Sequence, residues 1–254
     1  MLLTLDVGNT NTNLGVFEGE TLKMTARLNS DKNRTPDEYA SYLKNIFEIK
    51  SVNPAHIDGA VISSVVPAVG AAISNAVEIL CSVTPIMLGP GVKTGLNIKI
   101  DNPGQLGADL AAGAVAATRM YELPCIIFDL GTATTMSVID KNGVFRGGAI
   151  AAGLRTTLDA LAGKTSLLPM INIEAPQRVI GTNTVDSMQS GLVYGAAAML
   201  DGMIRLTENE LGEKATVIAT GGLGAIVVPL CEREIIYNPN LLFHGMRFIY
   251  SKNK

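Results

Sequence analysis

The stretch Leu2-Leu3-Thr4-Leu5-Asp6-Val7-Gly8-Asn9-Thr10-Asn11-Thr12 opens the chain and decides its fold. An apolar run leads into Asp6, Gly8 follows two residues later, and a cluster of small amide and hydroxyl side chains comes next. This pattern predicts a buried strand, a tight turn and a returning strand. Gly8 permits both a sharp turn and the close approach of a ligand to the backbone.

The polar residues of this turn are suited to phosphate oxygens. Backbone N–H groups and side-chain donors of residues 9–12 could hold such oxygens. Asp6, at the end of the strand, is placed to orient a hydrated Mg²⁺ ion, which prefers one or two carboxylates together with phosphate oxygens. The alternative is that the Asp-x-Gly-Asn sequence forms only a hairpin turn.

The same plan returns at Ile126-Ile127-Phe128-Asp129-Leu130-Gly131-Thr132-Ala133-Thr134-Thr135, again with an apolar strand that ends in Asp-x-Gly. In each copy a second turn, at 18–20 or 141–143, predicts a third strand, at 21–28 or 144–150. Asp6 and Asp129 lie 123 residues apart, about half the chain, so the sequence indicates two similar halves. Two such turns facing each other across a cleft would grip a nucleoside triphosphate.

Composition narrows the class of protein. The 254 residues suffice for one large domain or two smaller ones. The net charge of −3, the absence of Trp and the lack of a basic run argue against nucleic-acid binding. Three isolated cysteines indicate neither a disulfide framework nor a metal cluster. No apolar run reaches membrane-spanning length, and the chain begins directly with a strand, so we expect a cytoplasmic protein without a signal peptide.

Alternating helices and strands follow the first three strands. Thr35-Pro36-Asp37-Glu38 is a good helix start, Gly59 to Val65 predicts a buried strand, and Pro67 opens another helix. The prediction is a mixed sheet with helices on its faces. A further helix should run from Gly107 to about Tyr121, with Asp109 near its start. Asp109 is either a favourable first-turn acid or a general base.

Several motifs in the second half have more than one interpretation. Gly163-Lys164-Thr165 is not a phosphate-binding P-loop, because residue 158 is Leu and no strand leads in. A row of small residues between Ser187 and Gly202 permits close helix packing, either within one chain or between two. Thr220-Gly221-Gly222 turns from a buried strand into a helix, where a flat ring or a phosphate could lie against the backbone.

Taken together, these motifs resemble the type III pantothenate kinases, within the superfamily of acetate kinase, sugar kinases, heat-shock chaperones and actin. The resemblance covers nearly the whole chain in the family's order. The segments that carry it are Asp6 to Thr10, Gly89 to Gly95, Asn102-Pro103, Gly107-Ala108-Asp109, Asp129 to Thr134, Gly147 to Ile150, Asn183-Thr184, Ser187 to Gly191 and Thr220-Gly221-Gly222.

The resemblance implies two ribonuclease H-like halves, 1–120 and 121–254, each a mixed sheet with a three-strand meander and flanking helices, with an ATP cleft between them. It implies ATP-dependent phosphorylation of pantothenate, the first step of coenzyme A biosynthesis, in a homodimer. The ATP-binding residues would be Asp6, Val7, Gly8, Asn9, Thr10, Asn11, Thr12, Asn13, Thr132, Gly221 and Gly222, with Asp6 ordering Mg²⁺.

The remaining roles also follow from the resemblance. Asp109 would accept the proton of the substrate hydroxyl, and Asp129 would bind a monovalent cation, potassium or ammonium. The pantothenate-binding residues would be Gly107, Ala108, Asp109, Leu110 and, from the second subunit, Thr184.

Three positions depart from the family pattern. Leu110 stands where the family usually has Arg, Ile100 where it often has Tyr, and Ala152 where it often has Pro. Leu110 lacks the donors that Arg offers a carboxylate. Two other hypotheses therefore remain: a kinase for another small alcohol, or a non-catalytic nucleotide or metabolite sensor that regulates a protein partner.

Overall fold

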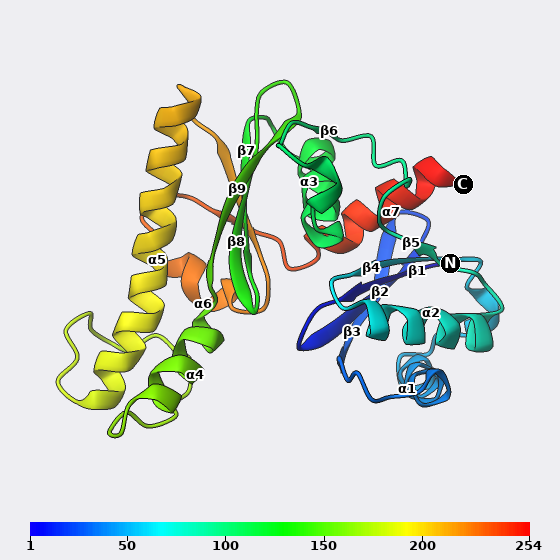
Figure 1. The fold of residues 1–254 in the computed structure, drawn as a ribbon, viewed down its shortest axis with the longest axis horizontal. Helices are drawn as coiled ribbons and strands as arrows, with labels where there is room; N and C mark the ends of the chain where they lie inside the picture. Colours follow the sequence, from blue (N-terminus) through cyan, green and yellow to red (C-terminus); the bar gives the residue numbers. More distant parts are fainter. The chain divides into compact units, whose positions relative to one another are not determined.

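One strand order occurs twice in the computed structural model, which describes residues 1–254 (Figure 1). The chain folds as two units. The first comprises Met1–Leu96, Asp101–Ala116 and Leu241–Lys254, and the second comprises Asn97–Ile100 and Ala117–Asn240. The expected halves, 1–120 and 121–254, differ from these units chiefly in the C-terminal segment, which belongs to the first unit.

A five-stranded sheet in the order β3-β2-β1-β4-β5 forms the centre of the first unit. Antiparallel pairing joins the first three strands into a meander, and β4 and β5 add in parallel. Asp6 pairs in register with Asn13 on β2 and Ser63 on β4. The bounds are β1 Leu2–Val7, β2 Asn11–Glu18, β3 Thr21–Asn29, β4 Gly59–Ser64 and β5 Ile86–Met87.

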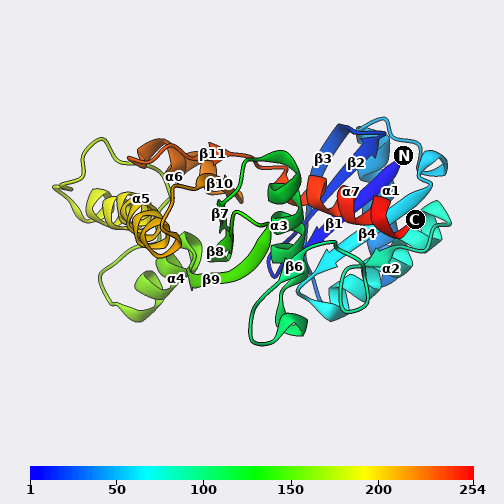
Figure 2. The same cartoon turned by 90° about the horizontal axis from the view of Figure 1, so that it is seen from above.

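Helices cover both faces of the first sheet. Alternate β1 residues such as Leu3 and Leu5 pack against Tyr39 and Ile73, which α1 (Pro36–Ile49) and α2 (Pro67–Cys81) contribute. The opposite face packs against the start of α3 (Ala108–Met120) and against α7 (Leu241–Asn253), which lies along the sheet in Figure 2. The predicted helix start at Thr35 is confirmed, because Thr35 and Glu38 form a capping box.

The second unit repeats this order with one strand added. Its sheet runs β11-β10-β7-β8-β9-β6, so β9-β8-β7-β10-β11 corresponds strand for strand to β3-β2-β1-β4-β5. The bounds are β6 Asn97–Ile98, β7 Cys125–Leu130, β8 Ala133–Ile139, β9 Val144–Ala152, β10 Thr216–Thr220 and β11 Ile236–Tyr237. The predicted α/β class with duplicated halves is confirmed.

One long helix dominates the core of the second unit. α5 (Thr184–Leu211) packs Val193 and Leu200 against Ile126 and Phe128 of β7, and α4 (Leu154–Lys164) adds Leu158 to the same core. Asn183 caps α5 by accepting the Asp186 N–H at 2.9 Å. α5 has 28 residues, but neither it nor any other helix has both the length and the apolar composition that crossing a bilayer requires.

One local expectation needs correction, and a short strand completes the second sheet. The segment between Gly89 and Gly107 contains the short strand β6, which pairs with β9, together with a 3₁₀ turn at Pro103–Gln105. The helix after Thr220-Gly221-Gly222 is only α6 (Gly224–Val227), and a 3₁₀ turn at Val228–Leu230 follows it. Pro229 lacks an N–H group and so cannot continue an α-helix there. A third 3₁₀ turn lies at Pro54–His56.

Candidate functional site

The β1–β2 turn of the first unit is tightly closed. Gly8 donates its N–H to the Asn11 carbonyl at 3.0 Å, and Ser30 donates its N–H to the Thr10 carbonyl at 3.0 Å. The buried Thr12 hydroxyl lies 2.9 Å from the Ser30 hydroxyl. Asn9 and Thr10 are exposed at the tip, so polar groups of this turn face solvent from a braced backbone.

The β7–β8 turn of the second unit has the same construction with one residue fewer. β1 and β7 share one burial pattern position by position, in which Asp6 and Asp129 are the half-buried members. Thr12 follows Val7 across residues 8–11, whereas Thr134 follows Leu130 across residues 131–133. The Gly131 N–H closes this shorter turn on the Ala133 carbonyl at 3.1 Å.

The turn after β10 lies directly against Asp129. Parallel pairing places Thr220 opposite Asp129, and the chain then turns through Gly221 with a positive φ of +88°. A Cβ atom on Gly221 would stand 2.6 Å from Asp129 Oδ1 and 2.6 Å from the Leu130 nitrogen. The second unit therefore brings Asp129 and Gly221 side by side, and the other two sequence-predicted residues, Thr132 and Gly222, lie in the turns that these residues begin.

Tyr237 on β11 supports this glycine turn. Its hydroxyl donates to the Gly221 carbonyl at 3.1 Å, and its ring lies where a Cβ on Gly224 would be. Burial raises the pKa of Tyr237, and the negative charge of Asp129 raises it further. The phenol is therefore a neutral donor at physiological pH.

Asp109 stands in the first turn of α3, in the part of that helix that belongs to the first unit. Its Oδ1 accepts the Leu110 N–H at 2.8 Å, and a Cβ on Gly107 would overlap that same oxygen. Asp109, Gly107, Ala108 and Leu110 are all half-buried, so the carboxylate stays in reach of a ligand. Because Gly107 has no side chain, the Asp109 carboxylate can occupy the space beside it.

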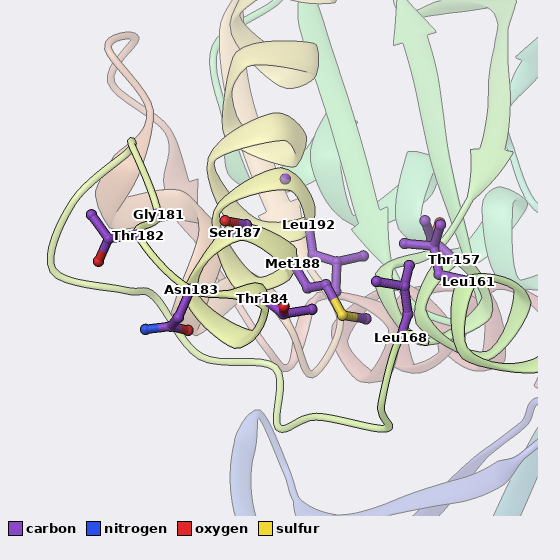
Figure 3. A pocket seen from close by; sticks show the side chains of 11 residues that line it. Thr157, Leu161, Leu168, Gly181, Thr182, Asn183, Thr184, Ser187, Met188 and Leu192 are labelled. Carbon is purple, nitrogen blue, oxygen red and sulfur yellow. The ribbon is translucent and has the colours of Figure 1, made fainter. Parts of the chain in front are cut away.

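Thr184 lines a separate cavity of about 640 Å³ in the second unit. α4 contributes Thr157 and Leu161, and the start of α5 contributes Ser187 and Met188. Figure 3 shows Met188 facing Leu168, which lies in the connection between the two helices. None of the four residues gathered at the ends of β7 and β10 lines this cavity.

Reasoning from the sequence missed three supporting positions: Gly153, Thr156 and Tyr237. Gly153 and Thr156 both donate a hydrogen bond to the Thr132 carbonyl. They stand at the start of α4, where small and hydroxyl residues are typical, so the sequence there indicates only a helix start and not this contact with the β7–β8 turn. The contact of Tyr237 with Gly221 joins residues 16 positions apart. Tyr237 lies in the two-residue strand β11, which is too short to show a pattern in the sequence.

The three cysteines are not ionised nucleophiles at neutral pH. Burial raises the pKa of Cys81 to about 11 and that of Cys125 to about 12. Burial, with a smaller contribution from Asp201, raises the pKa of Cys231 to about 11, so all three stay thiols at neutral pH. His244 packs edge-on against Phe17 with ring centroids 5.5 Å apart, and burial lowers its pKa.

The carboxylates suit a magnesium ion carried by a nucleotide. No group of three or more His, Cys, Asp or Glu side chains gathers into a protein cage for a metal. Mg²⁺ keeps several waters and commonly binds through one or two carboxylates and substrate phosphates. A single carboxylate such as Asp6, beside a turn that presents polar groups, fits this mode of binding.

Comparison with known proteins identifies a family. The family model described as type III pantothenate kinase matches residues 2–206. A protein of Halalkalibacterium halodurans named type III pantothenate kinase is 43% identical over 253 residues and covers all of both chains.

Solved structures share the fold at low sequence identity. A Campylobacter jejuni protein described as a Baf family transcriptional activator is 20% identical, with a TM-score of 0.63 over 99% of this chain and 98% of that one. A Sinorhizobium meliloti protein described as a 2-dehydro-3-deoxygalactonokinase is 13% identical, with a TM-score of 0.61 over 100% and 98%.

Proposed function

The chain belongs to the type III pantothenate kinase family, and from this premise we propose the roles of its residues in phosphorylating pantothenate with ATP. The reaction is the first step of coenzyme A biosynthesis. Its product carries the phosphate on the primary hydroxyl of pantothenate. The single observation that carries the proposal is the match of a full-length relative at 43% identity, to which the duplicated Asp-x-Gly turns add a physical rationale.

In the first unit, residues 6–13 hold phosphate oxygens and Asp109 accepts the substrate proton. The braced β1–β2 turn offers N–H groups and side-chain donors at a fixed position, and Asp6 orders the Mg²⁺ ion that ATP carries. Bound Mg²⁺ neutralises phosphate charge. Asp109 removes the proton from the attacking hydroxyl, and Gly107, Ala108 and Leu110 surround the acceptor.

In the second unit, Asp129 holds a monovalent cation, potassium or ammonium, and Thr132 contacts the ATP phosphates. The Gly221-Gly222 turn presents bare backbone to the nucleotide. These roles are supported by the crowding of Gly221 against Asp129 Oδ1, which leaves no room for a side chain at that position. They also suit phosphoryl transfer, which depends on positioning and charge neutralisation more than on covalent chemistry.

The enzyme works as a cytoplasmic homodimer in this proposal, with Thr184 reaching the substrate of the second subunit. Support comes from the segment beside the Thr184 cavity, which carries unusually exposed apolar side chains. Leu167 is 90% exposed and Ile180 is 82% exposed. An apolar group of this kind, next to polar residues, is typical of a protein contact surface.

The test is ADP release from the purified protein with ATP, Mg²⁺ and potassium or ammonium, with and without pantothenate. Release that depends on pantothenate, and that Asp109→Asn abolishes while nucleotide binding persists, supports the proposal. If ATP binds and pantothenate gives no stimulation, the acceptor is wrong. Because Leu110 stands where the family usually has Arg, a panel of other small alcohols is then the next assay.

A further inference from the structure

The start of α4 is built against the turn that contains Thr132. The Thr132 carbonyl accepts two hydrogen bonds from this helix start, from the Gly153 N–H at 3.1 Å and from Thr156 Oγ1 at 2.7 Å. A Cβ on Gly153 would overlap the carbonyl oxygens of Gly131 and Thr132, so the helix approaches as closely as a bare backbone allows. Leu154 and Leu158 anchor α4 in the core of the unit.

From this arrangement we infer that Thr156 is a positioning residue for the β7–β8 turn, holding Thr132 in the orientation that contacts the nucleotide. The inference rests on the proposed role of Thr132 in binding ATP phosphates. It assigns Thr156 no contact with substrate. The hydroxyl acts through the backbone carbonyl that it holds.

The two copies of the hairpin show why the second turn needs this support. In the first copy, the Ser30 N–H holds the Thr10 carbonyl, and the hydroxyls of Ser30 and Thr12 pair with each other. In the second copy, Gly153 takes the place of Ser30, and the buried Thr134 hydroxyl has no hydrogen-bond partner. The second copy therefore lacks the hydrogen bond between side chains that joins Ser30 and Thr12 in the first copy.

The hydroxyl of Thr156 supplies a different side-chain hydrogen bond to the turn, because it donates to the Thr132 carbonyl. Thr156 is the third residue of α4, after the helix-capping Gly153, so its hydroxyl can reach back over the helix start to the turn. α1 begins at Pro36, several residues after the first meander ends at Asn29, and no equivalent helix start follows that strand directly. In the second copy, therefore, the turn carbonyl is held by a hydroxyl from a helix start.

The geometry explains how a hydroxyl on one side of the peptide affects the other side. A trans peptide directs its C=O and N–H groups to opposite sides. Two donors on the Thr132 carbonyl therefore also fix the direction of the Ala133 N–H, while the Ala133 carbonyl accepts the Gly131 N–H. Removing the hydroxyl takes away one of these two donors and loosens this peptide plane.

The experiment compares Thr156→Val with Thr156→Ser and with the control Thr165→Val. Valine keeps the shape of threonine and removes the donor, whereas serine keeps the donor. Thr165 ends the same helix, is exposed, and donates its hydroxyl to the Leu161 carbonyl at 2.8 Å, so it matches Thr156 in chemistry and lies away from the turn. For each variant we would measure steady-state kinetics, the melting temperature and the calorimetric affinity for a non-hydrolysable ATP analogue.

Thr156→Val should weaken analogue binding and lower kcat/KM for ATP by about two- to twelvefold, the range that a neutral hydrogen bond supplies. KM for pantothenate should stay unchanged, Thr156→Ser should restore ATP affinity, and Thr165→Val should match the wild type. Unchanged ATP affinity in Thr156→Val would overturn the inference. So would equal losses for ATP and pantothenate that follow the melting temperature, because that result indicates general destabilisation.

The binding measurement separates this inference from the proposed function. A wild-type protein that binds the analogue without phosphorylating pantothenate overturns the proposed acceptor, while the affinities of the Thr156 variants still decide the inference. A wild-type protein that binds no nucleotide overturns both.

Discussion

Replacing Gly221 by alanine tests whether the turn after β10 must lack a side chain at residue 221 for the candidate site to form. The backbone at Gly221 has a φ of +88°, a conformation that residues with a Cβ adopt only at a cost. The added methyl group would also stand 2.6 Å from Asp129 Oδ1 and 2.7 Å from the Leu130 carbonyl carbon. One substitution therefore combines conformational strain with a collision at the proposed cation ligand.

Two other glycines separate these effects. Gly212 ends α5 with a φ of +75° and has nothing within 4 Å of the added Cβ, so its alanine variant should lose only the conformational term of about 1–2 kcal/mol. Gly222, the next residue of the turn, has neither a positive φ nor a neighbour within 4 Å. Gly221→Ala should lose the conformational term and a further overpacking term of about 1–3 kcal/mol, since backbone atoms of Leu130 cannot move aside easily.

The assay combines thermal unfolding with titration of the monovalent cation that the proposed function assigns to Asp129. At about 2–4 °C per kcal/mol for a chain of this size, the melting temperature should fall least for Gly222→Ala, more for Gly212→Ala and most for Gly221→Ala. Only Gly221→Ala should raise the concentration of potassium or ammonium needed for half-maximal activity. A Gly221→Ala protein as stable as Gly212→Ala, or one with an unchanged cation requirement, would refute the reasoning.

Asp109→Asn should lower kcat by roughly 10²–10⁴-fold with little change in nucleotide affinity, since the proposed function makes Asp109 the general base and gives it no phosphate contact. Single-turnover kinetics with an analogue-binding control will test this. Leu110→Arg should lower KM for pantothenate by about 10- to 100-fold, because arginine adds a bidentate donor for the pantothenate carboxylate. Leu110→Lys should lower this KM by a smaller factor. An unchanged KM in Leu110→Arg would place residue 110 away from the carboxylate. Burial raises the pKa of Glu208, but hydrogen bonds from Lys214, the Ala215 N–H and Arg233 outweigh it and hold that pKa below the usual 4.5. Above pH 4.5 the wild type should therefore have a free energy of unfolding about 1–3 kcal/mol higher than that of Glu208→Gln. This difference should vanish as the pH falls through the lowered pKa of Glu208 and the carboxylate is protonated. A difference that does not depend on pH would exclude the charge as its source.

The local part of the fold could be predicted because each hairpin carries its own signal. A strand ending in Asp-x-Gly, a returning strand and a second glycine turn lie within about 25 consecutive residues, and the spacing of Asp6 and Asp129 reveals the duplication. The helix start at Thr35 could be predicted for the same reason, since a cap and the N–H groups that it binds lie within four residues of each other.

The contacts that the sequence could not supply join distant segments. β6 has two residues, and its pairing with β9 spans more than 40 residues, so no periodicity marks it. The amphipathic pattern of residues 241–250 predicts a helix without saying which sheet it covers. The structure assigns it to the first unit, because Phe243 and Met246 pack with Leu2 and Val61.

The duplication also explains why similar motifs need not have equal roles. Ser30 and Gly153 occupy the same place in their two copies, each donating its N–H to a turn carbonyl. The serine adds a hydroxyl that satisfies Thr12, whereas the glycine leaves Thr134 without a partner and lets a helix begin against the turn. A one-residue difference after the third strand thus changes what supports the whole turn. Motif matching treats Asp6 and Asp129 as equivalents, but the residues behind them make two different supports, and only the second can be weakened by removing one hydroxyl on α4.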